Sequence, residues 1–282
     1  MTCGGMYMAG ELFVVGTPIG NLGDFSPRAQ QTLRSVDFIA AEDTRVTIKL
    51  LNYFDIKNKL VAYHEHNRAE KGPSIVQRIL DGESCALVTD AGMPAISDPG
   101  QDLVRLCHES GIKVSTVPGP SAIITALALS GLEVSRFTFE GFLTGNKPKR
   151  REHLEEIKTE RKTMVFYEAP HKLAATIHDL HTALGDRKIA LIKELTKIHE
   201  NIEFGTLAEL DGKYDGVKLK GEYVIIIEAK TEEELSAEKE EADPVELAKA
   251  YIEEGLSINE AAKKAAKETG ARKSDIYRQL TQ

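Results

Sequence analysis

Cysteines are scarce in this chain, and their placement argues against disulfide bonds or a zinc site. Only three occur in 282 residues, Cys3, Cys85 and Cys107, with no CxxC pair and no neighbouring His/Cys cluster. An odd number at wide spacing is not typical of a disulfide framework or of structural zinc. The composition therefore indicates a protein of a reducing compartment that depends on its hydrophobic core.

Long apolar runs and an N-terminal basic segment are also missing. The first basic residue is Arg28, so the start lacks the charged region of a signal peptide. The apolar run at residues 12–15 is far too short to cross a bilayer. We expect a cytoplasmic protein with no membrane segment. Residues 1–8 are expected to be loosely structured, and Met6 or Met8 could be the true start.

Positive charge is in deficit overall, but the deficit is concentrated in one segment. The net charge of −8 disfavours a nucleic-acid partner at first sight, because such affinity depends on Lys and Arg neutralising phosphates. Residues 231–243 hold seven acids and one lysine, a net charge of −6, which leaves −2 for the rest. Such a run is typical of a solvated linker, so we expect residues 231–243 to separate two parts of the chain.

Residues 11–131 alternate short apolar runs with helical stretches. Ser26 followed by Pro27 is a typical helix start, and Gly111 marks a helix end. Regular alternation with almost wholly apolar strands predicts an α/β domain whose parallel sheet is covered on both faces. The predicted strands are residues 12–15, 38–41, 60–63, 86–89 and 114–117.

A second α/β domain is predicted at residues 136–230, and a helical module at 244–282. The second domain has strands at residues 164–167, 189–192 and 223–227, with little helix between the later ones, which predicts a mixed sheet. In the C-terminal module, capping boxes begin at Asp243 and Ser257, and Gly255 and Gly270 mark helix ends. The pattern predicts three short helices in a layout similar to a helix-turn-helix.

Three loops follow predicted strands of the first domain and are rich in glycine and proline. Residues 16–24 contain three glycines but match neither a P-loop nor GxGxxG, and a simple turn would explain them equally well. Residues 89–100 hold two aspartates, two prolines and two glycines, and residues 118–122 form another stiff connection. Capping by Ser97, Asp98 or Ser121 is the alternative interpretation. Loops at the carboxyl ends of parallel strands are where open α/β sheets bind ligands.

Two further strand ends carry polar residues, at 42–45 and 64–68. His64 and His66 alternate along a strand and could be read as metal ligands, but the sequence offers no obvious third ligand. We therefore predict no metal, and interpret this segment as a solvated strand end.

Taken together, these motifs resemble the tetrapyrrole methylase family, and within it the members that methylate ribosomal RNA. Six motifs in order across residues 11–230 carry the resemblance: VGTPIGNL at 15–22, EDTR at 42–45, TDAGMPAISDPG at 89–100, PGPSA at 118–122, FYEAPH at 166–171 and KELTK at 193–197. Met93 and Lys172 stand where the family often shows other residues.

The resemblance implies two α/β domains with S-adenosylmethionine between them, and a homodimer. It further implies methyl transfer to the 2′-oxygen of a cytidine in 16S ribosomal RNA, in the decoding centre of the small ribosomal subunit. Carried over by motif, the predicted cofactor-binding residues are Asp90, Ala91, Gly92, Pro94, Ser121, Ala122, Tyr167, Leu195 and Thr196.

Methyl transfer from a sulfonium mainly requires alignment and exclusion of water, so no metal or covalent nucleophile is needed. A ribose hydroxyl is a poor nucleophile, and a positioned base or a nearby cation would help. Our catalytic candidates are Glu42 as base or orienting group, with Arg45 or Lys193 holding a phosphate or the developing oxyanion. Asp43 and Glu194 stand beside them. The alternative is that Arg45 and the acids form a structural ion pair.

Two basic groups are candidates for RNA contact. The first is Lys147, Lys149, Arg150 and Arg151. The second lies in the C-terminal module and comprises Lys263, Lys264, Lys267, Arg272, Lys273 and Arg278, a local charge of +4 after Glu268 and Asp275 are subtracted. These charges are compatible with phosphate contact, although any solvated helix face could carry them.

Two other functions remain open. The same scaffold could methylate a small tetrapyrrole or a protein side chain, although the basic groups favour RNA. The chain could also be a nucleic-acid-binding regulator whose α/β part only senses a ligand, although six motifs at polar strand ends favour chemistry.

Overall fold

The computed structural model describes residues 9–230, 243–253 and 255–281. The chain forms two compact units, Met1–Glu228 and Ala229–Gln282. Both predicted α/β domains fall in the first unit and the predicted helical module in the second. Residues 1–8, and all but the last residue of the predicted acidic linker, lie outside the described residues.

The first sheet contains five parallel strands in the order β3-β2-β4-β1-β5. All five match predicted strands to within one residue at either end, and the prediction of a parallel sheet is confirmed. Strands β2 and β4 are buried along their whole length because βαβ connections put helices on both faces. The strands are β1 (Glu11–Val15), β2 (Phe38–Ala41), β3 (Leu60–Ala62), β4 (Cys85–Val88) and β5 (Lys113–Val117).

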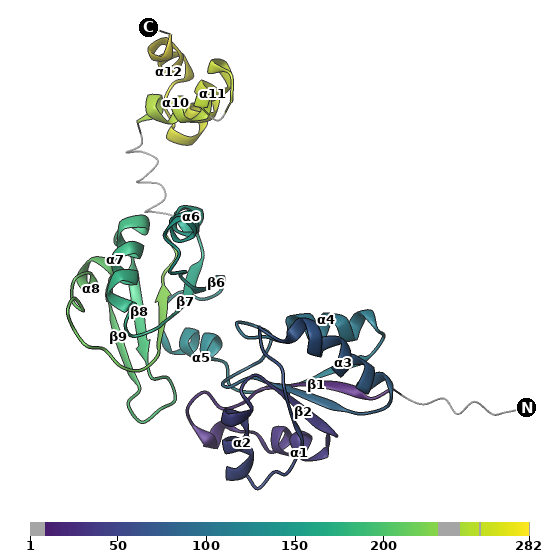
Figure 1. Ribbon diagram of the computed structural model, residues 1–282. Coiled ribbons are helices and arrows are strands. Elements are labelled where there is room, and N and C mark those ends of the chain that lie inside the picture. Colours follow the sequence, from purple (N-terminus) through teal and green to yellow (C-terminus); the bar gives the residue numbers. More distant parts are fainter. Residues whose placement is uncertain (1–8, 231–242, 254, 282) are drawn as a thin grey trace, which may run out of the picture. The chain divides into compact units, whose positions relative to one another are not determined.

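Helices cover both faces of this sheet (Figure 1). On one face, α1 (Pro27–Ser35) and α2 (Thr44–Tyr53) bury Leu33 and Leu51 in a cluster with Ile39. On the other face, α3 (Arg68–Leu80) and α4 (Gln101–Glu109) bury Ile75 and Leu103. Ser26 caps α1 by accepting a hydrogen bond from the Ala29 amide, as predicted. A short 3-10 turn, η1 (Leu22–Asp24), lies in the first glycine-rich loop.

The second sheet is mixed, as predicted, and has the order β6-β7-β10-β8-β9. Only the β6/β7 pair is parallel. The outer strands β6 and β9 were not predicted, because edge strands lack the apolar runs of buried ones and show mostly exposed or half-buried residues here. The strands are β6 (Phe137–Phe142), β7 (Thr163–Glu168), β8 (Lys188–Lys193), β9 (Asn201–Thr206) and β10 (Tyr223–Ile227).

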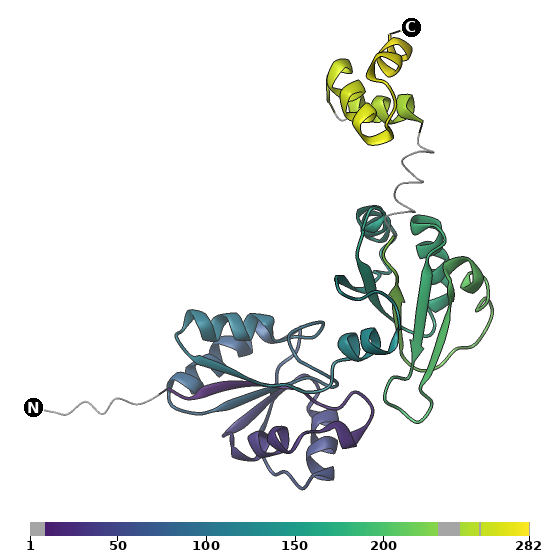
Figure 2. The ribbon, with the colours of Figure 1, turned by 180° about the vertical axis from the view of Figure 1, so that it is seen from behind.

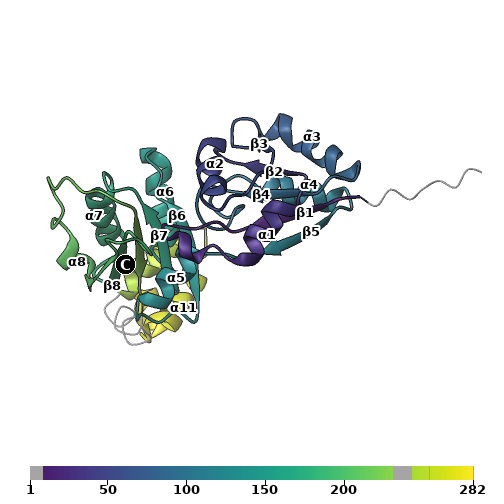
Figure 3. The same cartoon turned by 90° about the horizontal axis from the view of Figure 1, so that it is seen from below.

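Helix α5 (Ala122–Leu129) joins the two sheets. It follows the last strand of the first sheet, yet its Ile123, Ala126 and Leu127 pack against the second sheet. Figures 2 and 3 both show α5 beside the strands of that sheet. The opposite face is covered by α6 (Lys147–Ile157), α7 (Leu173–Leu184) and the short α8 (Leu207–Leu210). The start of α5 therefore lies where the two sheets meet.

The C-terminal unit is the predicted bundle of three helices, α10 (Pro244–Glu253), α11 (Ile258–Thr269) and α12 (Lys273–Leu280). Its small core contains Tyr251, Ala262 and Ile276. The capping box at Ser257 is present, and Gly270 ends α11 in the left-handed conformation, with φ of 73°. Among the described residues, no helix combines the length and the apolar character that spanning a membrane requires.

Candidate active site

Three loops meet at the carboxyl ends of the first sheet and hold one another through backbone contacts. Thr17 and Gly92 exchange two amide hydrogen bonds of 2.9 and 3.1 Å, and the Thr17 hydroxyl donates to the Thr89 carbonyl. Gly16 lies against Gly119 so closely that a Cβ on Gly16 would be 2.7 Å from the Gly119 Cα. Glycine is required here because no side chain fits between the two backbones.

The second sheet supplies the opposite wall through a strained loop after β8. Glu194 and Thr196 both have positive φ, 52° and 66°, on either side of Leu195. A β-branched threonine in this region is strained by roughly 1–3 kcal/mol. The loop is held because the Glu194 carboxylate accepts hydrogen bonds from Lys197 Nζ and the Glu222 amide, and Lys197 also binds the Glu222 carboxylate. These hydrogen bonds thus hold the strained loop and fix the place of Leu195.

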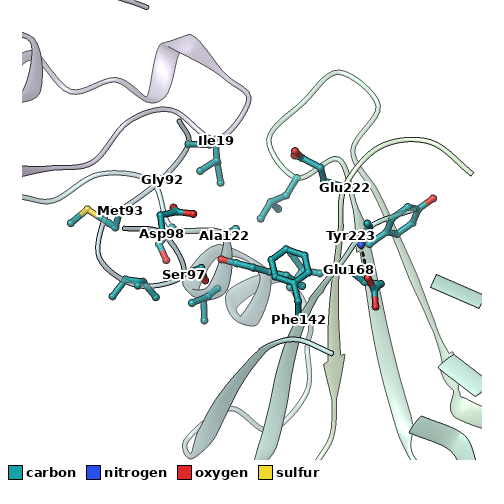
Figure 4. Close-up of a pocket in the computed structure, with 18 of the residues that line it drawn as sticks. Ile19, Gly92, Met93, Ser97, Asp98, Ala122, Phe142, Glu168, Glu222 and Tyr223 are labelled. Carbon is teal, nitrogen blue, oxygen red and sulfur yellow. Dashed lines mark hydrogen bonds between the residues drawn. The ribbon is translucent and has the colours of Figure 1, made fainter. Parts of the chain in front are cut away.

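A cavity of about 400 Å³, called here the first cavity, lies between these walls. Figure 4 shows Met93, Ser97 and Asp98 on one side of it and Glu168, Glu222 and Tyr223 on the other. The structure therefore brings together loops from two sheets. Six of the predicted cofactor-binding residues line it: Ala91, Gly92, Ser121, Ala122, Tyr167 and Leu195.

The other three predicted cofactor-binding residues, Asp90, Pro94 and Thr196, do not line the first cavity. Asp90 turns toward the second motif, where its carboxylate accepts a hydrogen bond from the Asp43 amide at 3.1 Å. Pro94 is buried, and Thr196 supports Leu195 from its strained position. Ser121 precedes α5 without making a side-chain cap, so capping does not explain its presence.

Several lining residues were not predicted individually. Asp98 and Glu168 fall inside motifs that the sequence analysis quoted, so a search of those motifs for acids could have found them. Phe142 was missed because it lies on the unpredicted strand β6. Its ring is 5.6 Å from that of Tyr167, and burial, followed by the charge of Asp98, raises the pKa of Tyr167 to about 12.

A second, more polar cavity of about 410 Å³ lies on the other side of the loop at residues 95–98. Glu42, Glu65 and Arg68 line it. Ile96, Ser97 and Asp98 line both cavities, so this loop forms their common wall. Residues 96–98 thus separate the first cavity, which is mainly apolar, from the second cavity, which is polar.

A carboxylate cluster joins the two cavities. The buried Thr89 hydroxyl lies 2.5 Å from the Glu42 carboxylate and 2.8 Å from that of Asp98. Burial raises the pKa of Asp98, the Thr89 hydrogen bond lowers it, and the charge of Glu42 raises it further, with a net increase. Burial likewise raises the pKa of Asp90. Acids with raised pKa values are frequent at functional sites.

Of the three catalytic candidates, Glu42 lines the second cavity, whereas Arg45 and Lys193 line neither of these two. Arg45 forms an ion pair with Asp43 at 2.7 Å, and its side chain is 87% exposed. This is the structural ion pair considered as the alternative above. Hydrogen bonds from Arg45 lower the pKa of Asp43 to about 2. Lys193 ends β8 opposite Tyr223, a lining residue of the first cavity.

The two histidines after β3 lie near each other, with ring centroids 6.1 Å apart. Within the described part of the chain, no three His, Cys, Asp or Glu residues are grouped so that they could hold a metal ion.

The basic candidates for RNA contact differ in exposure. Lys147, Lys149 and Arg151 are exposed at the start of α6. Arg150 is instead engaged inside the second domain, where its guanidinium donates to Asp179 at 2.6 Å and to Thr176 at 2.9 Å. All six basic candidates of the C-terminal unit are exposed; Lys264 lies over the Tyr251 ring and Arg278 pairs with Asp275.

Comparison with known proteins extends over nearly the whole chain. The family model described as "Tetrapyrrole (Corrin/Porphyrin) Methylases" matches residues 11–211. A protein of Halalkalibacterium halodurans named "Ribosomal RNA small subunit methyltransferase I" is 46% identical over 95% of this chain and 93% of its own length. A Bacillus subtilis protein of the same name is 41% identical over 98% and 96%, respectively.

Solved structures share the fold at low sequence identity. A diphthine synthase matches with a TM-score of 0.61 at 16% identity, covering 78% of this chain and 90% of its own. A uroporphyrin-III-C-methyltransferase from Thermus thermophilus matches with a TM-score of 0.55 at 17% identity, covering 78% and 94%. With its parallel and mixed sheets, its shared cavity and the match over residues 11–211, the chain belongs to the tetrapyrrole methylase family.

Proposed function

We propose that this protein transfers the methyl group of S-adenosylmethionine to the ribose 2′-oxygen of a cytidine in 16S ribosomal RNA, in the decoding centre of the small ribosomal subunit. The names of relatives that are 41–46% identical support methylation of small-subunit ribosomal RNA. The position of the methyl group follows from the resemblance of the six motifs. We expect the enzyme to work in the cytoplasm as a homodimer.

The observation that carries the proposal is the first cavity, which is lined from both sheets. Its volume of about 400 Å³ falls in the range of small-molecule sites. Small residues such as Gly92 and Ala122 leave space, whereas Leu195 and Tyr167 provide apolar walls. Asp98 adds a carboxylate to this lining, which complements the positive groups of S-adenosylmethionine. The lining therefore fits this methyl donor.

The sulfonium supplies an activated methyl group when it is bound, so the protein has to align the acceptor and exclude water. The second cavity offers the acceptor a place with Glu42 on its wall. Glu42 orients the ribose hydroxyl and favours loss of its proton. Arg45, exposed at the start of α2, holds an RNA phosphate, and the half-buried Lys193 adds positive charge beside the first cavity.

Contact with RNA beyond the acceptor comes from the exposed Lys147, Lys149 and Arg151 and from the basic face of α11 and α12. Deleting residues 244–282 is expected to weaken methylation of RNA more than binding of S-adenosylmethionine. Equal methylation by the shortened protein would remove the C-terminal unit from this role.

Transfer of a tritiated methyl group tests the proposal. Purified protein is incubated with labelled S-adenosylmethionine and with small ribosomal subunits, naked 16S RNA, or a free tetrapyrrole. Label in the RNA, with mass mapping to a cytidine ribose, supports the proposal. Label only in the tetrapyrrole would favour the small-molecule alternative. Binding of the donor without turnover to S-adenosylhomocysteine would indicate a ligand-sensing regulator.

A further inference from the structure

One buried hydroxyl sits between two carboxylates in the wall that both cavities share. Thr89 is only 2% exposed. Its Oγ1 atom lies 2.5 Å from a carboxylate oxygen of Glu42 and 2.8 Å from one of Asp98, both within hydrogen-bond distance. Glu42 and Asp98 come from different loops, after β2 and β4, so the tertiary structure alone creates this bridge.

A hydroxyl carries one hydrogen and can donate only one hydrogen bond, whereas ionised carboxylates only accept. Thr89 therefore cannot bond to two ionised carboxylates at once. Both short distances are satisfied when one carboxyl is protonated and donates to Thr89 Oγ1, while Thr89 donates to the other. The alternative, two anions facing one oxygen at a partly buried site, is unfavourable because their like charges repel.

We propose that Glu42 and Asp98, joined through Thr89, hold one proton between them and act as a single base that accepts the proton of the acceptor hydroxyl. This inference rests on the proposed function and extends it, because it makes Asp98 a partner of Glu42 and Thr89 a positioning residue. Asp98 lines both cavities and Glu42 the second. The pair thus spans the place where donor and acceptor meet.

The proton balance is simple. The ribose oxygen forms a bond to the methyl carbon as the bond between that carbon and sulfur breaks, and the hydroxyl O–H bond breaks. Its proton goes to the ionised member of the pair, so that each of the two carboxyl groups then carries one proton. One of these returns to water through the polar second cavity, and the pair is restored.

Other charged groups surround the pair without neutralising it. Asp90 lies near both acids, and the charges of Glu42 and Asp98 add to the burial that raises its pKa. Tyr167 faces Asp98 from the second sheet. In the second cavity Arg68 pairs with Glu65 at 2.9 Å and lies 4.0 Å from Asp102. Arg68 is thus engaged by two acids other than Glu42 and Asp98, and a proton shared through Thr89 balances the charge of the pair instead.

The test is a carbon-13 NMR titration of the side-chain carboxyl groups in the full-length protein. In the wild type, the Glu42 and Asp98 signals should each show two steps at common pH values, as expected for coupled groups. Two independent single-step curves would overturn the proposal. This readout needs neither RNA nor methyl donor, so it does not depend on catalysis.

Variants of Thr89 and Glu42 test whether the Thr89 hydroxyl couples the two carboxyl groups. Thr89→Val keeps the side-chain shape without the hydroxyl and should abolish the common steps, whereas Thr89→Ser should retain them. With Glu42→Gln, the Asp98 signal should titrate in one step, at lower pH than the upper step of the wild type. Glu65→Gln is the matched control, because Glu65 lines the second cavity without touching Thr89. Loss of the common steps in this control would contradict the assignment.

The rate of RNA methylation and its pH profile provide a further test. Thr89→Val should methylate RNA at least about tenfold more slowly and with a shifted pH profile, while binding S-adenosylmethionine as tightly as the wild type. An unchanged rate and profile would count against the shared proton. If wild-type protein methylates ribosomal RNA but its two carboxyls titrate independently, only this inference fails. If they are coupled and no RNA is methylated, the proposed function fails.

Discussion

Acids of the two α/β domains differ in what they bind. On the side of the first sheet, Asp90 and Asp98 bond to a backbone amide and a hydroxyl, and burial raises the pKa of both. On the side of the second sheet, Lys197 holds the pKa of Glu194 below its usual value. Burial alone would raise the pKa of Glu203, but hydrogen bonds from Lys213 and Tyr214 lower it.

The difference indicates that acids of the two α/β domains have different roles. Carboxylates already paired with lysine stabilise loops and strands, and they are poorly placed to accept a further proton. Carboxylates that are buried next to neutral donors keep a proton to higher pH than exposed ones do. We therefore propose that loops of the first sheet carry the proton transfer, while the second sheet supplies the facing wall of the first cavity.

The variant Glu42→Gln gives the most direct test of whether acids of the first sheet carry the proton transfer. If the first sheet carries the chemistry, methylation should fall by about 100-fold or more, because a positioned base contributes roughly that much. Binding of S-adenosylmethionine, measured by calorimetry, should stay within about twofold. Glu109→Gln serves as control, because Glu109 is exposed at the end of α4 and lines neither cavity. Near-normal turnover by Glu42→Gln would remove this residue from the mechanism.

Gly92→Ala tests the first-sheet side of the donor cavity. Gly92 has a φ of 86°, and a Cβ there would lie 3.3 Å from Ile19. The left-handed conformation costs an alanine about 1–2 kcal/mol, so binding of S-adenosylmethionine should weaken about tenfold. Gly145→Ala is the control, since its Cβ would have no atom within 4 Å. Unchanged affinity in Gly92→Ala would show that this loop does not shape the binding site.

Arg150 and its neighbour Arg151 test which basic residues of the second α/β domain are structural and which contact RNA. Arg150 is 15% exposed and paired with Asp179, so Arg150→Ala should lower the free energy of unfolding by about 1–2 kcal/mol. Arg151 is exposed, so Arg151→Ala should leave stability unchanged and weaken only RNA binding. Urea denaturation measures the first effect and RNA titration at fixed salt the second. Equal stability of the two variants would contradict the structural role of Arg150.

The smallest expected effect concerns Asp43, which forms an ion pair with Arg45. Because its pKa in the folded protein is lowered to about 2, its contribution to stability is present above about pH 4 and is lost as the pH falls toward 2. Arg45→Gln should raise the pKa of Asp43 toward its ordinary value and remove part of this dependence. NMR titration of the Asp43 carboxyl measures the shift. An unchanged pKa would mean that the ion pair does not form in solution.

Much of the fold could be predicted from the sequence because buried strands must be apolar and helix ends require particular residues. The runs before Gly16 and Thr89 gave β1 and β4, and Ser26 and Ser257 marked helix starts that the structure contains. The motifs also indicated the cofactor cavity, since six of the residues they contributed line it. These features are local, and a short stretch of sequence suffices to specify them.

Which of these residues come into contact depends on the tertiary structure. Edge strands β6 and β9 depend on pairing with buried neighbours and carry little pattern of their own. Helix α5 reads as part of the first domain but packs on the second sheet. Likewise, nothing in the spacing of Glu42, Thr89 and Asp98 reveals that one hydroxyl lies between two acids. The sequence determined residue types and local turns, whereas packing of separate strand ends determined the distances on which proton sharing depends.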